Sequence, residues 1–69
     1  MTIYNHKFED SSVIASASFN DEVSELTITF LNGRDYTYKD VLFNTYQDLI
    51  ASQSPGKYFA QIKKELQLK

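Results

Sequence analysis

The chain has 69 residues, a formal net charge of −2 and no cysteine. A chain of this length forms one domain and buries only about 60% of the surface that its unfolded form exposes, so its margin of stability is small. Disulfide bridges are excluded, and a single histidine, His6, does not suffice for a structural zinc site. Stability must therefore come from packing of the five Tyr and five Phe side chains, or from association into a homo-oligomer.

Charge and hydropathy exclude further classes. A protein that binds nucleic acid by neutralising phosphates usually has a basic excess, whereas this chain has seven Lys and Arg against nine Asp and Glu. No apolar run approaches the roughly 18 residues that a membrane span requires. The first ten residues lack the basic-then-apolar order of a signal peptide. We therefore expect a cytoplasmic protein with no membrane partner.

The first half of the chain has the pattern of strands. Residues 2–8 indicate either a short N-terminal strand or an ordered arm, and the segment is too brief to distinguish the two. From Ser12 to Asn20 the period of two predicts a half-buried strand, with Val13, Ala15, Ala17 and Phe19 on one side. Residues 26–30 alternate in the same way and are rich in β-branched and aromatic residues, which indicates another strand.

Asn32-Gly33 predicts a hairpin turn, since both residues tolerate a positive φ, and the returning strand is expected over residues 34–39. Two loop lengths are open. A two-residue loop pairs Thr29 with Tyr36 and places Tyr36 and Tyr38 on the face opposite the core. A three-residue loop with Gly33 as a bulge pairs Ile28 with Tyr36 and places both tyrosines on the core side.

The second half has the pattern of two helices. Apolar residues recur at spacings of three and four, which predicts one helix face formed by Leu42, Phe43, Tyr46, Leu49 and Ile50. Asp40 is the expected N-cap, and the helix should end near residues 52–53. Ser54-Pro55 predicts the start of a second helix, because serine caps free N–H groups and proline suits the first position. Its apolar face is expected to comprise Phe59, Ile62 and Leu66.

This order predicts an α+β domain. We expect a three-stranded antiparallel β-meander followed by two α-helices packed on one face (β-β-β-α-α), with an extra N-terminal strand as an open alternative. Residues 1–10 would be an arm or short strand, and residues 11–69 a single domain.

Several segments, in the right order, resemble the KTSC domain family. The longer matches are L-x-I-x-F-x-N-G at residues 26–33, Y-x-Y at 36–38 and S-P-G-K-Y-F at 54–59. The shorter ones are Ser11-Ser12 with Ile14 and Ser16, Phe19-Asn20, Asp40-Val41 and Ile62-Lys63. There are two departures: Ser18-Phe19-Asn20 stands where the family often has Gly-Tyr-Asp, and Leu42 where it often has proline.

The KTSC family is named after the C-terminal extension of some lysyl-tRNA synthetases and also occurs as short stand-alone bacterial and phage proteins. The resemblance therefore implies a small binding module with RNA or another nucleic acid as partner. The acidic charge and the aromatic surplus indicate an alternative, a protein-interaction module that serves as an adaptor or as a phage-encoded modulator of a host protein.

Two segments supply the candidate binding residues. If Tyr36 and Tyr38 are exposed, they form a stacking platform, worth about 1–3 kcal/mol per base; otherwise they are a core pair. At residues 54–57, free N–H groups at a helix start favour an anion, Gly56 permits a close approach, and Lys57 supplies a cation. The alternative there is a plain Ser54 cap with a solvated lysine. Neighbouring candidates are Tyr58, Lys63 and Lys64.

The inventory of side chains argues against catalysis. There is no cysteine nucleophile, and His6 has no obvious carboxylate nearby to orient it. The adjacent carboxylates at residues 9–10 and 21–22 have the pattern of solvated turns. We predict no catalytic residue, no cofactor and no metal ligand.

Overall fold

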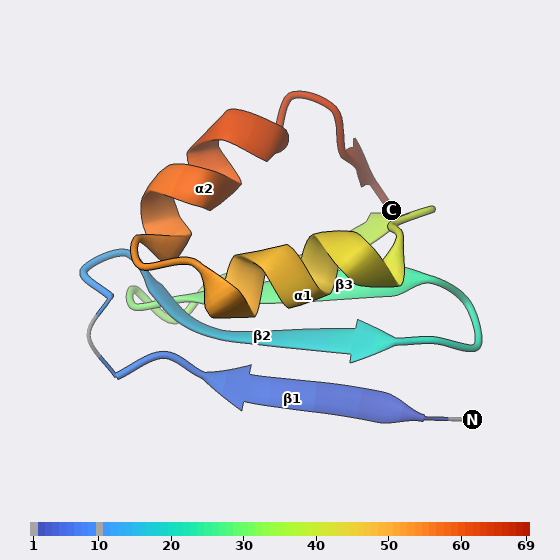
Figure 1. Cartoon of the computed structure of the whole chain (residues 1–69), viewed down its shortest axis with the longest axis horizontal. Helices are drawn as coiled ribbons and strands as arrows, with labels where there is room; N and C mark the ends of the chain where they lie inside the picture. The colour runs from blue at the N-terminus through green and yellow to red at the C-terminus, as the bar shows by residue number, and fades with distance from the viewer. Residues whose placement is uncertain (1, 10) are drawn as a thin grey trace.

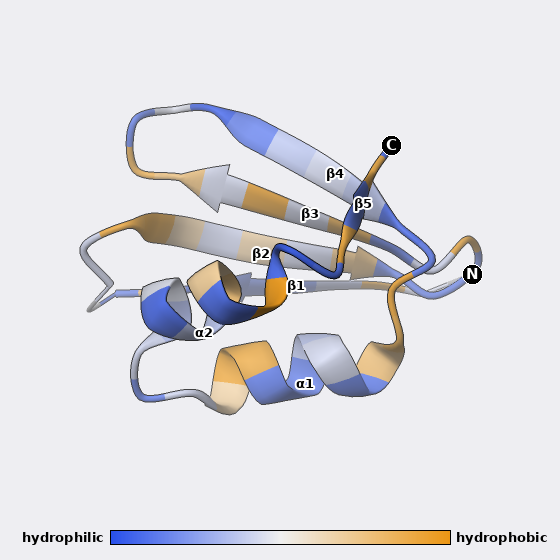
Figure 2. Ribbon diagram, turned by 90° about the horizontal axis from the view of Figure 1, so that it is seen from above, coloured by the Kyte–Doolittle hydropathy of each residue, from blue (hydrophilic) through white to orange (hydrophobic). Residues whose placement is uncertain are grey.

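The computed structural model describes residues 2–9 and 11–69, and these form a five-stranded antiparallel sheet covered on one face by two helices (Figure 1, Figure 2). The strands follow one another across the sheet in chain order, β1-β2-β3-β4-β5. Their bounds are β1 Ile3–Lys7, β2 Ile14–Asn20, β3 Glu25–Phe30, β4 Asp35–Lys39 and β5 Gln67–Leu68. The helices are α1 Phe43–Ala51 and α2 Pro55–Ile62.

The predicted class, α+β with two helices after a meander on one face, is confirmed, but the strand number is wrong. Residues 3–7 form a full strand, β1, rather than an arm, and β5 was not predicted at all. The two residues of β5 are too few to show a period. Met1 and Asp10, the ends of the predicted arm, lie outside the described residues.

The hairpin between β3 and β4 has the three-residue loop. Ile28 pairs with Tyr36 and Leu26 with Tyr38, and Gly33 has a φ of 89°. The N–H of Gly33 donates to the carbonyl of Phe30 at 3.0 Å. A type I turn followed by a left-handed glycine has this geometry. Both tyrosine positions therefore lie on the helix-covered face of the sheet.

A β-bulge in β2 changes which residues of this strand face the core. The pairing with β3 shifts between Ile14 and Ser16, so Ile14 lies opposite Phe30 and is fully buried. The alternating pattern predicted that Val13 faces the core, and this was wrong. A bulge adds one residue to the strand, so the residues before it face the opposite side from the one that strict alternation predicts. Val13 is 48% exposed.

The helix starts differ from those predicted. Asp40 has a φ of 56° and does not cap α1; the N-cap is Leu42, whose side chain points to solvent instead of joining the buried face. This left-handed turn lets Val41 enter the core while its N–H donates to the carbonyl of Ser24. Ser54 is the N-cap of α2, as predicted, but its side chain makes no capping hydrogen bond.

The core lies between the sheet and the helices and is largely aromatic. Phe19 stacks with Tyr46 of α1, with ring centroids 5.7 Å apart, and Phe59 of α2 packs edge-on against Phe30 and Tyr38 at 5.7 Å each. Thus α1 covers the β1–β2 side and α2 covers the β3–β4 side. Neither helix in the described part of the chain is long and apolar enough to cross a membrane.

Candidate functional site

A shallow groove runs between α2 and the β4–β5 side of the sheet, and we call it the α2–β4 groove. It has a volume of about 270 Å³ and is lined by Val13, Phe30, Tyr36, Tyr38, Gly56, Phe59, Ala60, Lys63 and Leu68. The three-residue hairpin loop and the β2 bulge create it: the first directs the tyrosines towards α2, and the second leaves Val13 outside the core.

The two tyrosines of the groove have different roles. Tyr38 is only 8% exposed, packs on Phe59, and has its pKa raised above the ordinary value by burial and then by the neighbouring Tyr36. Tyr36 is 39% exposed and packs edge-on against Phe30 at 5.7 Å. Tyr38 is therefore a core residue, and Tyr36 alone offers a ring to a partner.

A second hollow lies at the start of α2. It is about 310 Å³ and is lined by Ser11, Ser12, Val13, Gln53, Ser54, Pro55, Gly56 and Lys57. Val13 and Gly56 line both this hollow and the α2–β4 groove, so the two adjoin each other. Gly56 has a packing role: a β-carbon there would lie 3.2 Å from Cβ of Val13.

The lysines of α2 and of the turn after it are distributed unevenly around these hollows. Lys63 lines the groove and Lys57 lines the adjoining hollow, whereas Lys64 is exposed and lines neither. Lys69 forms an ion pair with Glu25 at 2.9 Å. Two lysines, rather than a broad basic surface, therefore border the groove.

Tyr58 lies apart from the other candidates. It is partly buried against the core, and its pKa is raised by that burial, and then by the negative charges of Asp48 and Glu65. A tyrosine in this environment is a packing residue of the α1–α2 contact rather than part of the groove.

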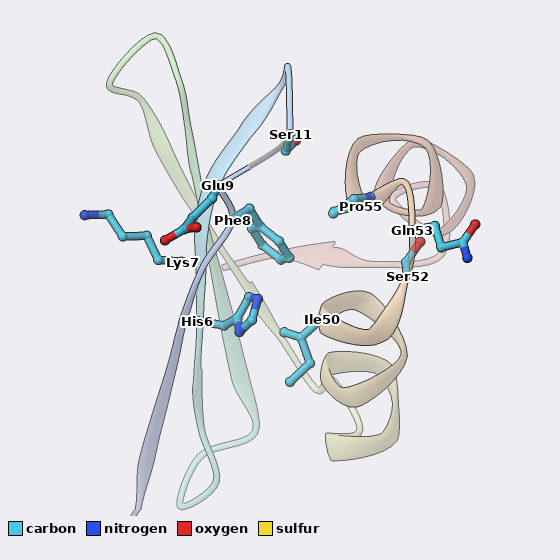
Figure 3. A pocket seen from close by; sticks show the side chains of 9 residues that line it. All are labelled: His6, Lys7, Phe8, Glu9, Ser11, Ile50, Ser52, Gln53 and Pro55. Atoms are coloured by element: carbon cyan, nitrogen blue, oxygen red, sulfur yellow. The ribbon is translucent and has the colours of Figure 1, made fainter.

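A third hollow, larger than the other two, was not predicted from the sequence. It is about 430 Å³, lies between the end of β1 and the α1–α2 connection, and is lined by His6, Lys7, Phe8, Glu9, Ser11, Ile50, Ser52, Gln53 and Pro55. His6, Phe8 and Ile50 point into it, whereas Lys7 points away (Figure 3). His6 packs edge-on against Phe8 at 4.7 Å. The hydroxyl oxygens of Ser11 and Ser52 already accept backbone N–H groups.

Comparison with known proteins gives the family. The model of the KTSC domain matches residues 10–65. This chain belongs to the KTSC domain family. The crystal structure of a KTSC domain protein from Yersinia pestis matches 99% of this chain and 96% of that chain, with a TM-score of 0.87 and 23% sequence identity. This similarity shows the fold. No curated protein matches the chain.

The KTSC match contains β2, β3, β4 and both helices, and so holds every predicted binding residue. It ends before β5, whose Leu68 also lines the groove and was missed. The apolar spacing of Leu66 and Leu68 was the only sequence signal for it. In this KTSC domain the structure brings Tyr36, Tyr38, Gly56 and Lys63 together, with Ser54 and Lys57 next to them.

Proposed function

We propose that this KTSC domain is a non-catalytic protein-interaction module whose α2–β4 groove binds a short peptide segment of a partner protein. The peptide would insert one apolar or aromatic side chain and place acidic side chains near Lys63 and Lys57. The observation that supports this most is the gathering of exposed apolar side chains at one groove, where Val13, Tyr36 and Leu68 are 48%, 39% and 59% exposed.

The size of the groove favours a single anchoring side chain. Its volume of about 270 Å³ is smaller than the roughly 300–1,000 Å³ of sites that enclose a drug-sized molecule. Interfaces commonly have a central aromatic anchor surrounded by a polar rim. Tyr36 and Phe30 would contact the inserted side chain on the sheet side, and Ala60 on the helix side.

Charge favours an acidic peptide. Lys63 lines the groove, Lys57 borders the adjoining hollow, and no Asp or Glu among residues 2–9 and 11–69 lines the groove. An acidic residue on the peptide would therefore meet cations without a competing carboxylate.

RNA binding stays a prediction of the family resemblance, and we rank it second. The predicted stacking platform needs two exposed rings, and Tyr38 is buried. In this alternative a base would stack on Tyr36 and the phosphates would contact Lys57, Lys63 and Lys64. The three lysines would then contribute equally to affinity, because counterion release depends on the number of charges.

Selection of displayed random-sequence peptides against the wild-type domain, with counter-selection against Tyr36→Ala, tests the proposal. We expect enriched peptides with a large apolar residue close to Asp or Glu, and amide chemical-shift changes confined to the groove. Peptides that bind Tyr36→Ala equally well would contradict it. Salt-sensitive binding of single-stranded RNA that falls equally on replacing any one of the three lysines would establish the RNA alternative instead.

A further inference from the structure

No described segment pairs with the outer side of β1, and two hydrogen bonds to β2 and its flank fix which peptide groups of this strand face outward. The N–H of Phe8 donates to the carbonyl of Ala15 at 2.9 Å, and the N–H of Asp21 donates to the carbonyl of Thr2 at 3.1 Å. Bonding direction alternates along an antiparallel strand, so even-numbered residues of this segment bond to β2. The N–H and carbonyl groups that point away from the sheet are those of Ile3, Asn5 and Lys7.

This edge lacks most of the devices that keep strand edges from pairing. Such devices include proline, bulges and a covering loop. Residues 2–9 contain no proline, the pairing of β1 with β2 has no shift in register, and no described segment pairs with the outer side of β1. Ile3 is 51% exposed at this edge.

We infer that β1 pairs antiparallel with β1 of a second copy of this chain, so that the two domains share one continuous sheet. A two-fold axis at Asn5 places Ile3 opposite the partner's Lys7 and Asn5 opposite the partner's Asn5. In this register, outward-facing peptide groups meet outward-facing peptide groups along the whole strand.

The side chains of β1 are compatible with this register. No like charges lie opposite each other, the apolar stem of the partner's Lys7 covers Ile3, and the two Asn5 amides can hydrogen-bond to each other. A register moved so that Lys7 faces its own copy would oppose two cations. The sequence of the strand therefore favours the symmetric pairing centred on Asn5.

The other sheet edge explains why the assembly would stop at two copies. β5 has only two residues, Gln67–Leu68, and offers too short a template for a five-residue strand. Pairing of β1 with β1 is isologous and closes after one contact. The α2–β4 groove lies on the β4–β5 side of the sheet, so both grooves stay open in the dimer. The inference does not depend on the proposed function.

Sedimentation velocity over a range from low micromolar to millimolar protein tests the inference. We expect the weight-average mass to rise from the monomer value of 8.0 kDa towards twice that value. Asn5→Pro removes one outward N–H and no bond to β2, so it should remain monomeric with an unchanged far-ultraviolet spectrum. Asn5→Ala keeps the N–H and is the matched control; it should still associate.

A charge exchange tests the register and does not rely on proline. In this register, Ile3→Lys places a second cation opposite the partner's Lys7 at each end of the strand pair. The repulsion should weaken association at least about threefold. Adding Lys7→Glu turns each repulsive pair into an attractive one and should restore it. Tyr36→Ala should leave association unchanged. A wild-type chain that stays monomeric throughout, or a double variant that associates no better than Ile3→Lys, would overturn the inference.

Discussion

Val13 packs directly against Gly56, so that the bulged end of β2 and the first turn of α2 meet without an intervening side chain. A β-carbon on Gly56 would lie 3.2 Å from Cβ and 3.3 Å from Cγ2 of Val13, closer than ordinary van der Waals contact. This contact lies between the α2–β4 groove and the hollow at the start of α2, and both residues line both. The glycine of the S-P-G-K segment thus has a structural reason that involves no ligand.

We predict that Gly56→Ala lowers the free energy of unfolding by about 1 kcal/mol, because overpacking forces Val13 to shift. The same change in a Val13→Ala background should be neutral or stabilising, since the contact is gone and alanine favours a helix. Gly33→Ala is the matched control: it should cost about 1–2 kcal/mol in either background, because its φ of 89° is the cause. Urea unfolding of the variants measures this, and equal costs of Gly56→Ala in both backgrounds would contradict it.

The two groove tyrosines should differ in stability. Tyr38→Ala removes a buried ring that packs on Phe59 and should cost about 3–5 kcal/mol. Tyr36→Ala removes a partly exposed ring at the sheet border and should cost about 1 kcal/mol or less. Thermal unfolding of both variants measures the difference. Similar losses would mean that Tyr36 is a core residue and unsuited to contact a partner.

The order β2-β3-β4-α1-α2 was readable from the sequence because period and turn signals are local. Asn32-Gly33 located the hairpin and Ser54-Pro55 located the start of α2. The loop length was not readable, since both a two-residue and a three-residue loop suit these residues. Only the burial of Tyr38 against Phe59 selects between them, and that contact joins segments far apart in the chain.

The candidate site was predicted in part for the same reason. Tyr36, Gly56 and Lys63 were singled out from local patterns, and the structure brings them to one groove. Val13 was assigned to the core because a bulge leaves no reliable mark in an alternating pattern. The hollow next to His6 needed knowledge that β1 pairs with β2, which a short segment does not encode by itself.

On the open face of the sheet, the hydroxyls of Thr27 and Thr37 form a cross-strand hydrogen bond of 2.9 Å. We predict that the two threonines are coupled by about 0.2–1 kcal/mol in a double-mutant cycle with Thr27→Val and Thr37→Val. Because the pair is only partly buried, each single change should be small. Strictly additive effects would show that the bond contributes nothing to stability.

Stability should fall in alkaline solution. Burial raises the pKa of Tyr46 above its ordinary value of 10.0, and burial followed by the nearby Tyr36 raises that of Tyr38. Above pH 10 the unfolded chain therefore loses phenolic protons that the folded chain keeps, which favours unfolding. The contribution is complete below the unfolded pKa and is lost as pH rises through the folded one. As the pH is raised above 10, the urea midpoint of unfolding should fall less for Tyr46→Phe than for the wild type. The same dependence of the midpoint on pH in both proteins would contradict the role of burial.

Two adjacent lysines provide the most direct test of peptide binding in the groove. Lys63 lines the α2–β4 groove and Lys64, one residue later, does not. For a groove-binding acidic peptide obtained by selection, we predict by titration calorimetry that Lys63→Ala weakens binding by about threefold to fivefold. Lys64→Ala should leave the dissociation constant unchanged. Equal losses for the two variants would mean that general positive charge, rather than the groove, holds the partner.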